Sequence, residues 1–522
     1  MRKDTDQPSP SPHDETFRPI WLYRLVLCTV ISISTIVSPA RAADCPVWGQ
    51  AYSRNMISAE TGLADRFDPA TGENIKWIAP LGTQTYATPI VASGKVFIGT
   101  NNERPRDPEH EGDRGVLLCL NESDGSLCWQ LLATKLSDEI YKDWPKAGMC
   151  SPPTVEGDRV YMVTNRGEIV CLDIEGQANG NDGPFRNEAR HMTPPDKTPV
   201  KLKKTDADIL WCYDIPEQMG LFPHDSAHCS IMIHGPFLYV NTNSGLKGTH
   251  AELRMPEAPS LIVLEKTTGR LLAQENSGIG PGIFHSTWSS PGMAQVNGKT
   301  QVFFAGGNGV CYAFEPMREV PPVGTVATLK EVWRFDCDPT APKENIHEYV
   351  RNRKVSPSNI KSTPVFYKNR IYVTYGGDIW WGKEQAWLKC FDATGTGDIT
   401  TQAELWCYPV ELHCCSTPSI SNGLAFVADC GRNIHCVDAE TGKPYWTHEC
   451  KGEIWASTLV ADGKIYLGTR RRDFWIMAAD KEKKVLSTVK LDSAIVGSAI
   501  AANGVVYVPT MKSLYAIQKT AP

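Results

Sequence analysis

The sequence predicts an all-β fold, an eight-bladed β-propeller built from four-stranded antiparallel blades. A Ser/Thr-rich start followed by apolar strands recurs eight times along the chain of 522 residues. The last three starts, Ser416, Ser457 and Ser498, are 41 residues apart, which matches the length of a four-stranded blade. The 42 Gly, 37 Pro and 15 Trp residues indicate many turns and aromatic plugs, and they argue against a helical bundle.

Each predicted blade begins with a short polar start and continues into a second strand of β-branched and aromatic residues. The starts lie at Ala87, Cys150, Cys229, Ser289, Ser362, Ser416, Ser457 and Gly497. The second strands lie near residues 95–100, 159–164, 237–242, 300–304, 370–374, 424–427, 464–469 and 505–508. Runs of this composition between turn residues are typical of strands buried on both faces. Eight starts and eight second strands predict eight blades.

The hairpin between the third and fourth strands is clearest at residues 436–446. Asp438 and Thr441 cap the turn, and Gly442 supplies a positive φ. Trp446 then ends the unit as a large flat plug between blades.

An additional copy of this hairpin at residues 68–77 predicts how the ring closes. The eighth repeat ends near Ile517 without a Trp-bearing strand. We therefore expect the segment around Trp77 to complete the last blade, because closure removes the exposed sheet edges. The alternative is an open sandwich of repeats. The propeller domain is predicted to cover residues 66–522, after a lead-in at residues 43–65.

The first forty-two residues have the pattern of a targeting segment. An apolar run at residues 25–37 is shorter than the roughly 20 residues that span a bilayer. Ala40-Arg41-Ala42 gives the small-x-small pattern of a cleavage site. Residues 1–42 are therefore predicted to be a secretory signal peptide, with an uncleaved membrane anchor as the alternative. Either reading places the propeller in the periplasm or outside the cell, with membrane contact only through an uncleaved segment.

The net charge and the cysteine content indicate which partners and which compartment the protein does not have. The formal net charge of −6 excludes nucleic-acid binding driven by overall basicity. The 17 cysteines would be unusual in a reducing cytosol. Ten of them fall on third and fourth strands, which suggests intrablade disulfides between Cys119 and Cys128, Cys171 and Cys212, Cys311 and Cys337, Cys390 and Cys407, and Cys436 and Cys450.

One face of the predicted ring collects chemically capable side chains. The loops that lead into first strands and the loops that join second to third strands open on the same face. They carry His224, Asp225, His228, Trp288, Asn308, Lys361, Asp378, Trp380, Cys414, Cys415, Trp455 and Arg470. Because first strands line the axis of a propeller, these residues are expected to ring the mouth of a central funnel, the default pocket.

Two parts of this face are candidates for catalysis or metal binding. Asp378 lies in a Gly-Gly-Asp turn and is the candidate catalytic base or metal ligand. His224, Asp225 and His228 share one short loop, so with Asp378 they are candidate metal ligands. The alternative for each is a polar loop residue with a purely local hydrogen bond.

The hairpin motif resembles the tryptophan-docking repeat of the pyrroloquinoline quinone (PQQ) propeller superfamily, with Cys in place of the usual Ala. The matching residues are Cys436, Asp438, Thr441, Gly442, Lys443 and Trp446. Residues 224–228 and 377–382 are also similar to segments of exported bacterial PQQ-binding-like propellers. This superfamily contains quinoprotein alcohol dehydrogenases, which bind PQQ and usually Ca²⁺ in the funnel. It also contains cofactor-free scaffolds, among them a lipoprotein that assists outer-membrane barrel assembly.

The resemblance implies roles for the funnel residues in cofactor binding. Trp288, Trp380 and Trp455 would stack on a flat quinone. The positive side chains of Lys361 and Arg470 would meet its carboxylates, and Asn308 would be a further cofactor contact. Cys414 and Cys415 resemble the vicinal disulfide of PQQ dehydrogenases, although in those enzymes it lies in an early blade and here it opens the sixth. Interblade packing, solvated turns and free thiols are the corresponding alternatives.

Two functions follow from these observations. The favoured one is a ligand-binding or protein-interaction scaffold in the cell envelope, without a cofactor and with an unknown protein or small molecule as its partner. The alternative is a dehydrogenase that uses PQQ and Ca²⁺ to oxidise an alcohol or a sugar. A metal-dependent enzyme that uses the His and Cys loops is a third possibility.

Overall fold

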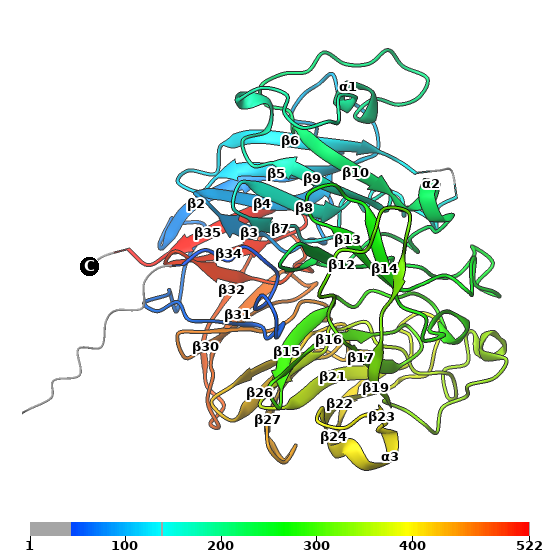
Figure 1. Cartoon of the computed structure of the whole chain (residues 1–522). Helices are drawn as coiled ribbons and strands as arrows, with labels where there is room; N and C mark the ends of the chain where they lie inside the picture. Colours follow the sequence, from blue (N-terminus) through cyan, green and yellow to red (C-terminus); the bar gives the residue numbers. More distant parts are fainter. Residues whose placement is uncertain (1–42, 137–138, 521–522) are drawn as a thin grey trace, which may run out of the picture. The chain divides into compact units, whose positions relative to one another are not determined.

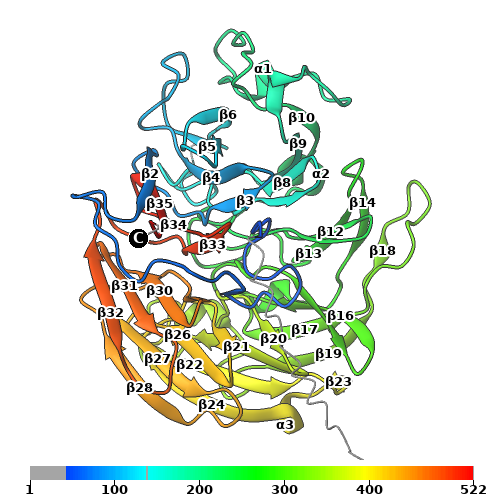
Figure 2. The ribbon, with the colours of Figure 1, turned by 90° about the vertical axis from the view of Figure 1, so that its left-hand side faces the viewer.

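The computed structural model describes residues 43–136 and 139–520, which form a ring of eight small sheets (Figures 1 and 2). The predicted eight-bladed β-propeller is confirmed, and every expected second strand is present. The predicted signal segment at residues 1–42 lies outside the described residues.

The first four blades follow one another along the chain. Blade 1 contains β3 (Ile90–Ala92), β4 (Lys95–Asn101), β5 (Arg114–Asn121) and β6 (Leu127–Thr134). Blade 2 contains β7 (Thr154–Glu156), β8 (Arg159–Val163), β9 (Glu168–Asp173) and β10 (Ile209–Asp214). Blade 3 contains β11 (Met232–His234), β12 (Phe237–Asn241), β13 (Leu261–Glu265) and β14 (Leu271–Gln274). Blade 4 contains β15 (Gly292–Val296), β16 (Lys299–Ala305), β17 (Val310–Phe314) and β19 (Glu331–Asp336).

The remaining blades complete the circle. Blade 5 contains β20 (Val365–Tyr367), β21 (Arg370–Gly376), β22 (Gln385–Asp392) and β24 (Glu404–Glu411). Blade 6 contains β25 (Ser419–Ser421), β26 (Leu424–Ala428), β27 (Asn433–Asp438) and β28 (Pro444–Glu449). Blade 7 contains β29 (Leu459–Ala461), β30 (Lys464–Gly468), β31 (Asp473–Ala478) and β32 (Val485–Lys490). Blade 8 contains β33 (Ile500–Ala502), β34 (Val505–Pro509), β35 (Ser513–Gln518) and β2 (Ile75–Pro80).

Short additions extend three blades beyond the predicted four strands. Each is a two-residue strand that pairs in parallel with an edge strand: β1 (Ile57–Ser58) with β29, β18 (Ala327–Thr328) with β14, and β23 (Gly397–Asp398) with β19. The helices are short: α1 (Glu188–His191), α2 (Ile215–Met219) and α3 (Thr400–Ala403). In the described part of the chain, no helix has the length and apolarity needed to cross a membrane.

The two ends of the propeller domain close the ring as predicted. Strand β2 pairs antiparallel with β35, and Trp77 lies opposite Ala516 while Ile78 lies opposite Tyr515. Both views show these strands side by side (Figures 1 and 2). Blade 8 therefore combines the first long strand of the domain with the last three.

The Ser/Thr-rich starts are explained by a ring of hydrogen bonds around the axis. Two residues before six of the eight inner strands, a backbone N–H donates to the Ser or Thr hydroxyl at the same position of the next blade. The series runs from Ser230 to Ser290, Thr363, Thr417, Ser457, Ser498 and Thr88, with donor–acceptor distances of 2.9 to 3.1 Å. In blade 2 the equivalent position is Pro152, which has no N–H to donate.

The Trp residues that end the blades act as plugs between neighbouring sheets. Trp406 of blade 5 donates its indole N–H to Ala439 O of blade 6 at 3.2 Å. Its ring lies against Gly442, where φ is +71° and an added Cβ would come within 2.6 Å of the indole. Gly442 is therefore required both for the turn and for the close approach of Trp406.

The lead-in at residues 43–65 runs across the blades (Figure 2). Its backbone carbonyls accept hydrogen bonds from N–H groups of the inner strands of five blades, those of Val91, Val155, Met293, Phe366 and Val460. Arg54 within it is fully buried and donates to Pro291 O at 2.8 Å and to Trp48 O at 3.0 Å. This segment joins the inner strands of blades that are distant in sequence.

The predicted intrablade disulfides are not formed, since the described cysteines are all free thiols. Strand register explains two of these errors. Cys171 lies opposite Trp211, so the next residue, Cys212, points to the other face of the sheet. The same offset separates Cys390 from Cys407.

The other predicted pairs are also unbonded. Cys436 lies opposite Trp446, and Cys450 follows four residues later, roughly 13 Å farther along the strand direction. Cys311 and Cys337 have their sulfur atoms 4.0 Å apart, about twice the length of a disulfide bond. Cys119 and Cys128, which flank a bulge, are likewise free.

Candidate functional site

A cavity of about 400 Å³ opens at the axis of the ring, on the face that the topology predicted. Seven of the predicted site residues line it: Asp225, His228, Trp288, Lys361, Trp380, Cys415 and Trp455. Further aromatic rings come from Trp48, Tyr86, Tyr141, Trp144 and Trp381. The volume lies in the range of sites for small organic ligands.

Three consecutive loops of blades 3 and 4 are joined beside this cavity. Isolated bridges connect Pro223 to Ser244 and Gly245 to Ser286, so the segment after β12 lies between the loops that lead into β11 and β15. An added Cβ on Gly245 would come within 2.6 Å of His224 Cβ and 2.7 Å of His285 O. Glycine at this position therefore permits the close approach of the three loops.

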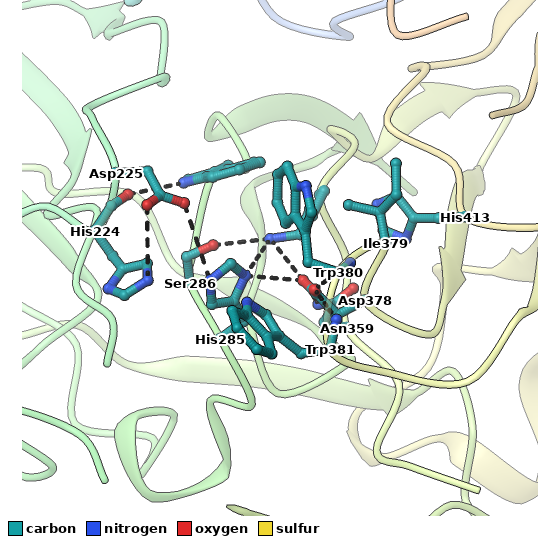
Figure 3. A network of polar contacts seen from close by, with 12 residues as sticks. His224, Asp225, His285, Ser286, Asn359, Asp378, Ile379, Trp380, Trp381 and His413 are labelled. Carbon is teal, nitrogen blue, oxygen red and sulfur yellow. Dashed lines mark hydrogen bonds and ion pairs between the residues drawn. The ribbon is translucent and has the colours of Figure 1, made fainter. Parts of the chain in front are cut away.

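Asp378 is the centre of a buried polar network (Figure 3). Its Oδ2 accepts from His285 Nδ1 at 2.9 Å and from Asn359 Nδ2 at 3.1 Å, and it lies 3.2 Å from Lys361 Nζ. Its Oδ1 accepts the backbone N–H groups of Trp380 and Trp381 at 2.9 and 3.0 Å. Both carboxylate oxygens are therefore occupied by protein donors.

Lys361 connects this network to the aromatic wall. Its ammonium donates to Ser286 Oγ at 2.8 Å and lies 3.8 Å from the centre of the Trp288 ring. A cation over an indole face is stabilised by the ring quadrupole. Lys361 is thus held by a carboxylate, a hydroxyl and an aromatic face together.

Burial and charge shift the acid–base behaviour of these groups. Burial alone would raise the pKa of Asp378, but His285 and Lys361 outweigh it and hold that pKa well below its ordinary value. Burial lowers the pKa of His285 to about 4 and that of His228 to about 3, so both imidazoles are neutral at pH 7. Burial raises the pKa of Asp225 to about 7.

Three histidines converge beside the cavity, one from each joined loop. His224, His250 and His285 each present a ring nitrogen within 4.8 Å of the other two. Their side chains are almost completely buried, at 0%, 5% and 1% exposure. Asp225 lies next to them, with carboxylate oxygens 3.9 Å from His224 Nε2 and 3.9 Å from His285 Nε2.

Two residues of this arrangement were not predicted from the sequence. His250 lies in the long segment between β12 and β13, and Tyr141 lies between β6 and β7; neither was among the predicted site residues. Tyr141 stacks on His224 with ring centres 5.7 Å apart. The rule that second-to-third loops share the funnel face would have identified His250, because it applies to every blade.

Several predicted site residues have other roles. Asn308 donates to Tyr312 Oη at 2.8 Å and does not line the cavity. Arg470 pairs with Glu453 at 2.8 Å and covers the Trp455 ring at 4.4 Å. Cys414 is buried in the core between blades 5 and 6, so only Cys415 of the adjacent pair faces the cavity, and no vicinal disulfide is formed.

His413 and Cys415 form a second polar group, of which Cys415 lines the cavity. His413 Nδ1 contacts Gly377 O, and nearby Cys415 favours the protonated ring, which raises the pKa of His413 despite its burial. Contact with Cys430 and the charge of His413 together hold the pKa of Cys415 well below its ordinary value.

The funnel residues do not match the donors that PQQ and Ca²⁺ require. Ca²⁺ takes six to eight oxygen ligands, whereas both oxygens of Asp378 are already bonded and its neighbours are imidazole nitrogens. Lys361 and Arg470, the cations predicted to meet quinone carboxylates, are each paired with a carboxylate of this chain. The aromatic rings fit a flat ligand, but the polar groups do not fit this cofactor pair.

Comparison with known proteins gives a family match and several structural likenesses. A family model described as the outer membrane protein assembly factor BamB matches residues 60–319 and 384–520. Comparison with curated proteins finds no match.

Solved structures resemble the chain at low sequence identity. The crystal structure of BamB from Moraxella catarrhalis is 13% identical, covers 84% of this chain and 98% of its own, and gives a TM-score of 0.51. The quinohemoprotein alcohol dehydrogenase of Comamonas testosteroni is 11% identical, covers 93% and 82%, and gives 0.55. A europium-containing methanol dehydrogenase is 12% identical, covers 90% of each chain, and also gives 0.55. At these identities the likenesses establish the fold.

Proposed function

We propose that this chain, which belongs to the family of the outer membrane protein assembly factor BamB, is an exported propeller of the cell envelope. We further propose that its funnel binds a small cyclic ligand. The signal-like pattern at residues 1–42 supports the export. The same repeat specifies the ring whether or not a cofactor is present, so the family match leaves the contents of the funnel open.

The aromatic lining of the funnel carries the proposal. Trp288, Trp380 and Trp455 follow one another along the wall, with ring centres 5.9 and 5.8 Å apart in edge-to-face contact. Their rings remain beside an open volume of about 400 Å³. Aromatic faces next to a few fixed polar groups are typical of sites that bind cyclic ligands.

The fold is also compatible with two other functions. The family description favours a protein-interaction scaffold, in which the outer surface of the ring would contact a partner protein. The dehydrogenase alternative would place PQQ and Ca²⁺ in the funnel. The paired states of Asp378, Lys361 and Arg470 argue against this cofactor pair.

A dye-binding experiment tests the proposal. Anilinonaphthalene sulfonate, an anion with a naphthalene and a phenyl ring, should bind the purified protein with a stoichiometry of one and fluoresce. Trp455→Ala removes a funnel ring and should weaken binding about fivefold or more, since one aromatic contact contributes about 1 kcal/mol. Trp475→Ala is the matched control, because Trp475 packs against His448 outside the cavity.

The outcomes separate the three functions. Binding that is unchanged in Trp455→Ala, or absent from the folded protein, would overturn the funnel proposal and favour the protein scaffold. Displacement of the dye by PQQ only when Ca²⁺ is present would favour the dehydrogenase.

A further inference from the structure

We propose that His224, His250 and His285, together with Asp225, form a binding site for a divalent transition-metal ion of the Zn²⁺ class in the funnel wall. The inference stands independently of the organic ligand proposed for the funnel. It rests on four features of these residues: convergence, unsatisfied nitrogens, orientation and access.

The first two features are found together. The three rings offer nitrogens within 4.8 Å of one another. Among the described residues, the Nε2 atoms of all three have no hydrogen-bond partner although they are buried. Leaving a polar atom buried and unpaired costs about 1–3 kcal/mol. Each of the three neighbouring rings therefore has a buried nitrogen without a partner, which indicates a common partner, and a metal ion would satisfy all three at once.

The third feature is the way each ring is fixed. His224 Nδ1 donates to Leu246 O at 2.8 Å, and His250 Nδ1 donates to Gly248 O at 3.1 Å. His285 Nδ1 donates to the Asp378 carboxylate at 2.9 Å. This arrangement places the proton on Nδ1 and leaves the Nε2 lone pair free. Metal-binding histidines are oriented in this way by backbone carbonyls and carboxylates.

The fourth feature is access from the funnel. His250, His285 and Asp225 line the cavity, while His224 lies behind them. Asp225 lies between His224 and His285 (Figure 3), so an ion held by the three nitrogens would have its carboxylate as a fourth donor. Asp225 adopts a φ of +66°, an uncommon conformation for a residue other than glycine. This backbone conformation belongs to the turn that places its carboxylate between two imidazoles.

The donor set selects the type of ion. Three imidazole nitrogens and one carboxylate suit Zn²⁺ and neighbouring transition ions, whereas Ca²⁺ and Mg²⁺ require oxygen ligands. Three imidazoles and one carboxylate fill the four positions of a tetrahedral ion. An oxygen or anionic group of a molecule in the funnel would therefore reach the ion only as a fifth ligand or in place of Asp225.

Co²⁺ binding tests the proposal because its visible absorption reports ligand type. The purified protein, stripped with a chelator, should bind one equivalent of Co²⁺ with a tetrahedral spectrum that lacks a thiolate charge-transfer band. Zn²⁺ should displace it and Ca²⁺ should not. His250→Ala, a loop substitution, should weaken binding at least tenfold. His347→Ala should leave it unchanged, since His347 bonds to Ile283 O outside the cluster.

Three results would overturn the inference. They are the absence of Co²⁺ binding at micromolar concentration, a thiolate band that assigns the ion to cysteines, and unchanged affinity in His250→Ala. Circular dichroism of each variant confirms that the protein compared is folded. If no Co²⁺ binds, a buried water molecule would be the partner of the three nitrogens.

Discussion

Lys361 Nζ lies 3.2 Å from Asp378 Oδ2, and neither side chain is exposed to solvent. This pair connects the cavity wall to His285, since Lys361 lines the cavity and the same carboxylate oxygen also accepts from His285. A buried ion pair contributes little net stability, but removal of one partner leaves an uncompensated charge.

Lys361→Met should therefore destabilise the protein by about 3–5 kcal/mol, because Asp378 would remain buried without its cation. Urea denaturation measures the change. Lys330→Met is the matched control, since Lys330 pairs with Glu315 at the exposed surface and its loss should have little effect. Equal midpoints for the two variants would show that Lys361 is not needed to compensate the buried carboxylate.

Thr417→Val should break one link of the axial hydrogen-bond ring. The N–H of Thr363 donates to the Thr417 hydroxyl at 2.9 Å in a buried position, so the substitution leaves it unpaired. We expect a loss of about 1–3 kcal/mol. Thr417→Ser retains the hydroxyl and should lose much less. If thermal or urea denaturation finds the two variants equally stable, the ring does not contribute through its hydrogen bonds.

The repeat made the fold predictable, whereas the site could be predicted only in part. Inner strands, Trp plugs and the closing strand follow from local patterns that recur, and closure by Trp77 was confirmed. His250 was missed because the rule for second-to-third loops was applied only to the start of the long segment between β12 and β13, at Asn243. The disulfides were predicted from the recurrence of cysteines on the third and fourth strands of five blades, but a shift of one residue, as between Cys171 and Cys212, reverses the face.

Gly245→Ala should disturb the three histidine loops. Its Cβ would come within 2.6 Å of His224 Cβ and 2.7 Å of His285 O, and neither atom belongs to a flexible chain end. Overpacking of this kind costs about 1–3 kcal/mol. Co²⁺ binding should weaken together with stability. Ser244→Ala, one residue earlier, is the control, and a Gly245→Ala protein with normal stability and Co²⁺ binding would contradict the expectation.

Glu168 should make stability depend on pH in the acid range. Burial disfavours its charge, but His191 at 3.0 Å and Arg166 at 2.9 Å outweigh burial and lower its pKa from 4.5 to about 2. Because the folded pKa is the lower one, the stabilisation is complete above pH 4.5 and is lost as pH falls toward 2.

The full effect is on the order of 3 kcal/mol, since one pKa unit corresponds to about 1.4 kcal/mol. Urea midpoints measured between pH 5 and 2 should fall more steeply for the wild type than for Glu168→Gln, which does not titrate. Parallel curves for the two proteins would rule out this contribution.

Anomalous X-ray scattering at the zinc absorption edge tests the central claim most directly, using crystals grown with Zn²⁺. The account predicts one strong peak about 2.0–2.1 Å from the Nε2 atoms of His224, His250 and His285. A funnel wall without that peak, with zinc only at cysteines or at the outer surface, would contradict it.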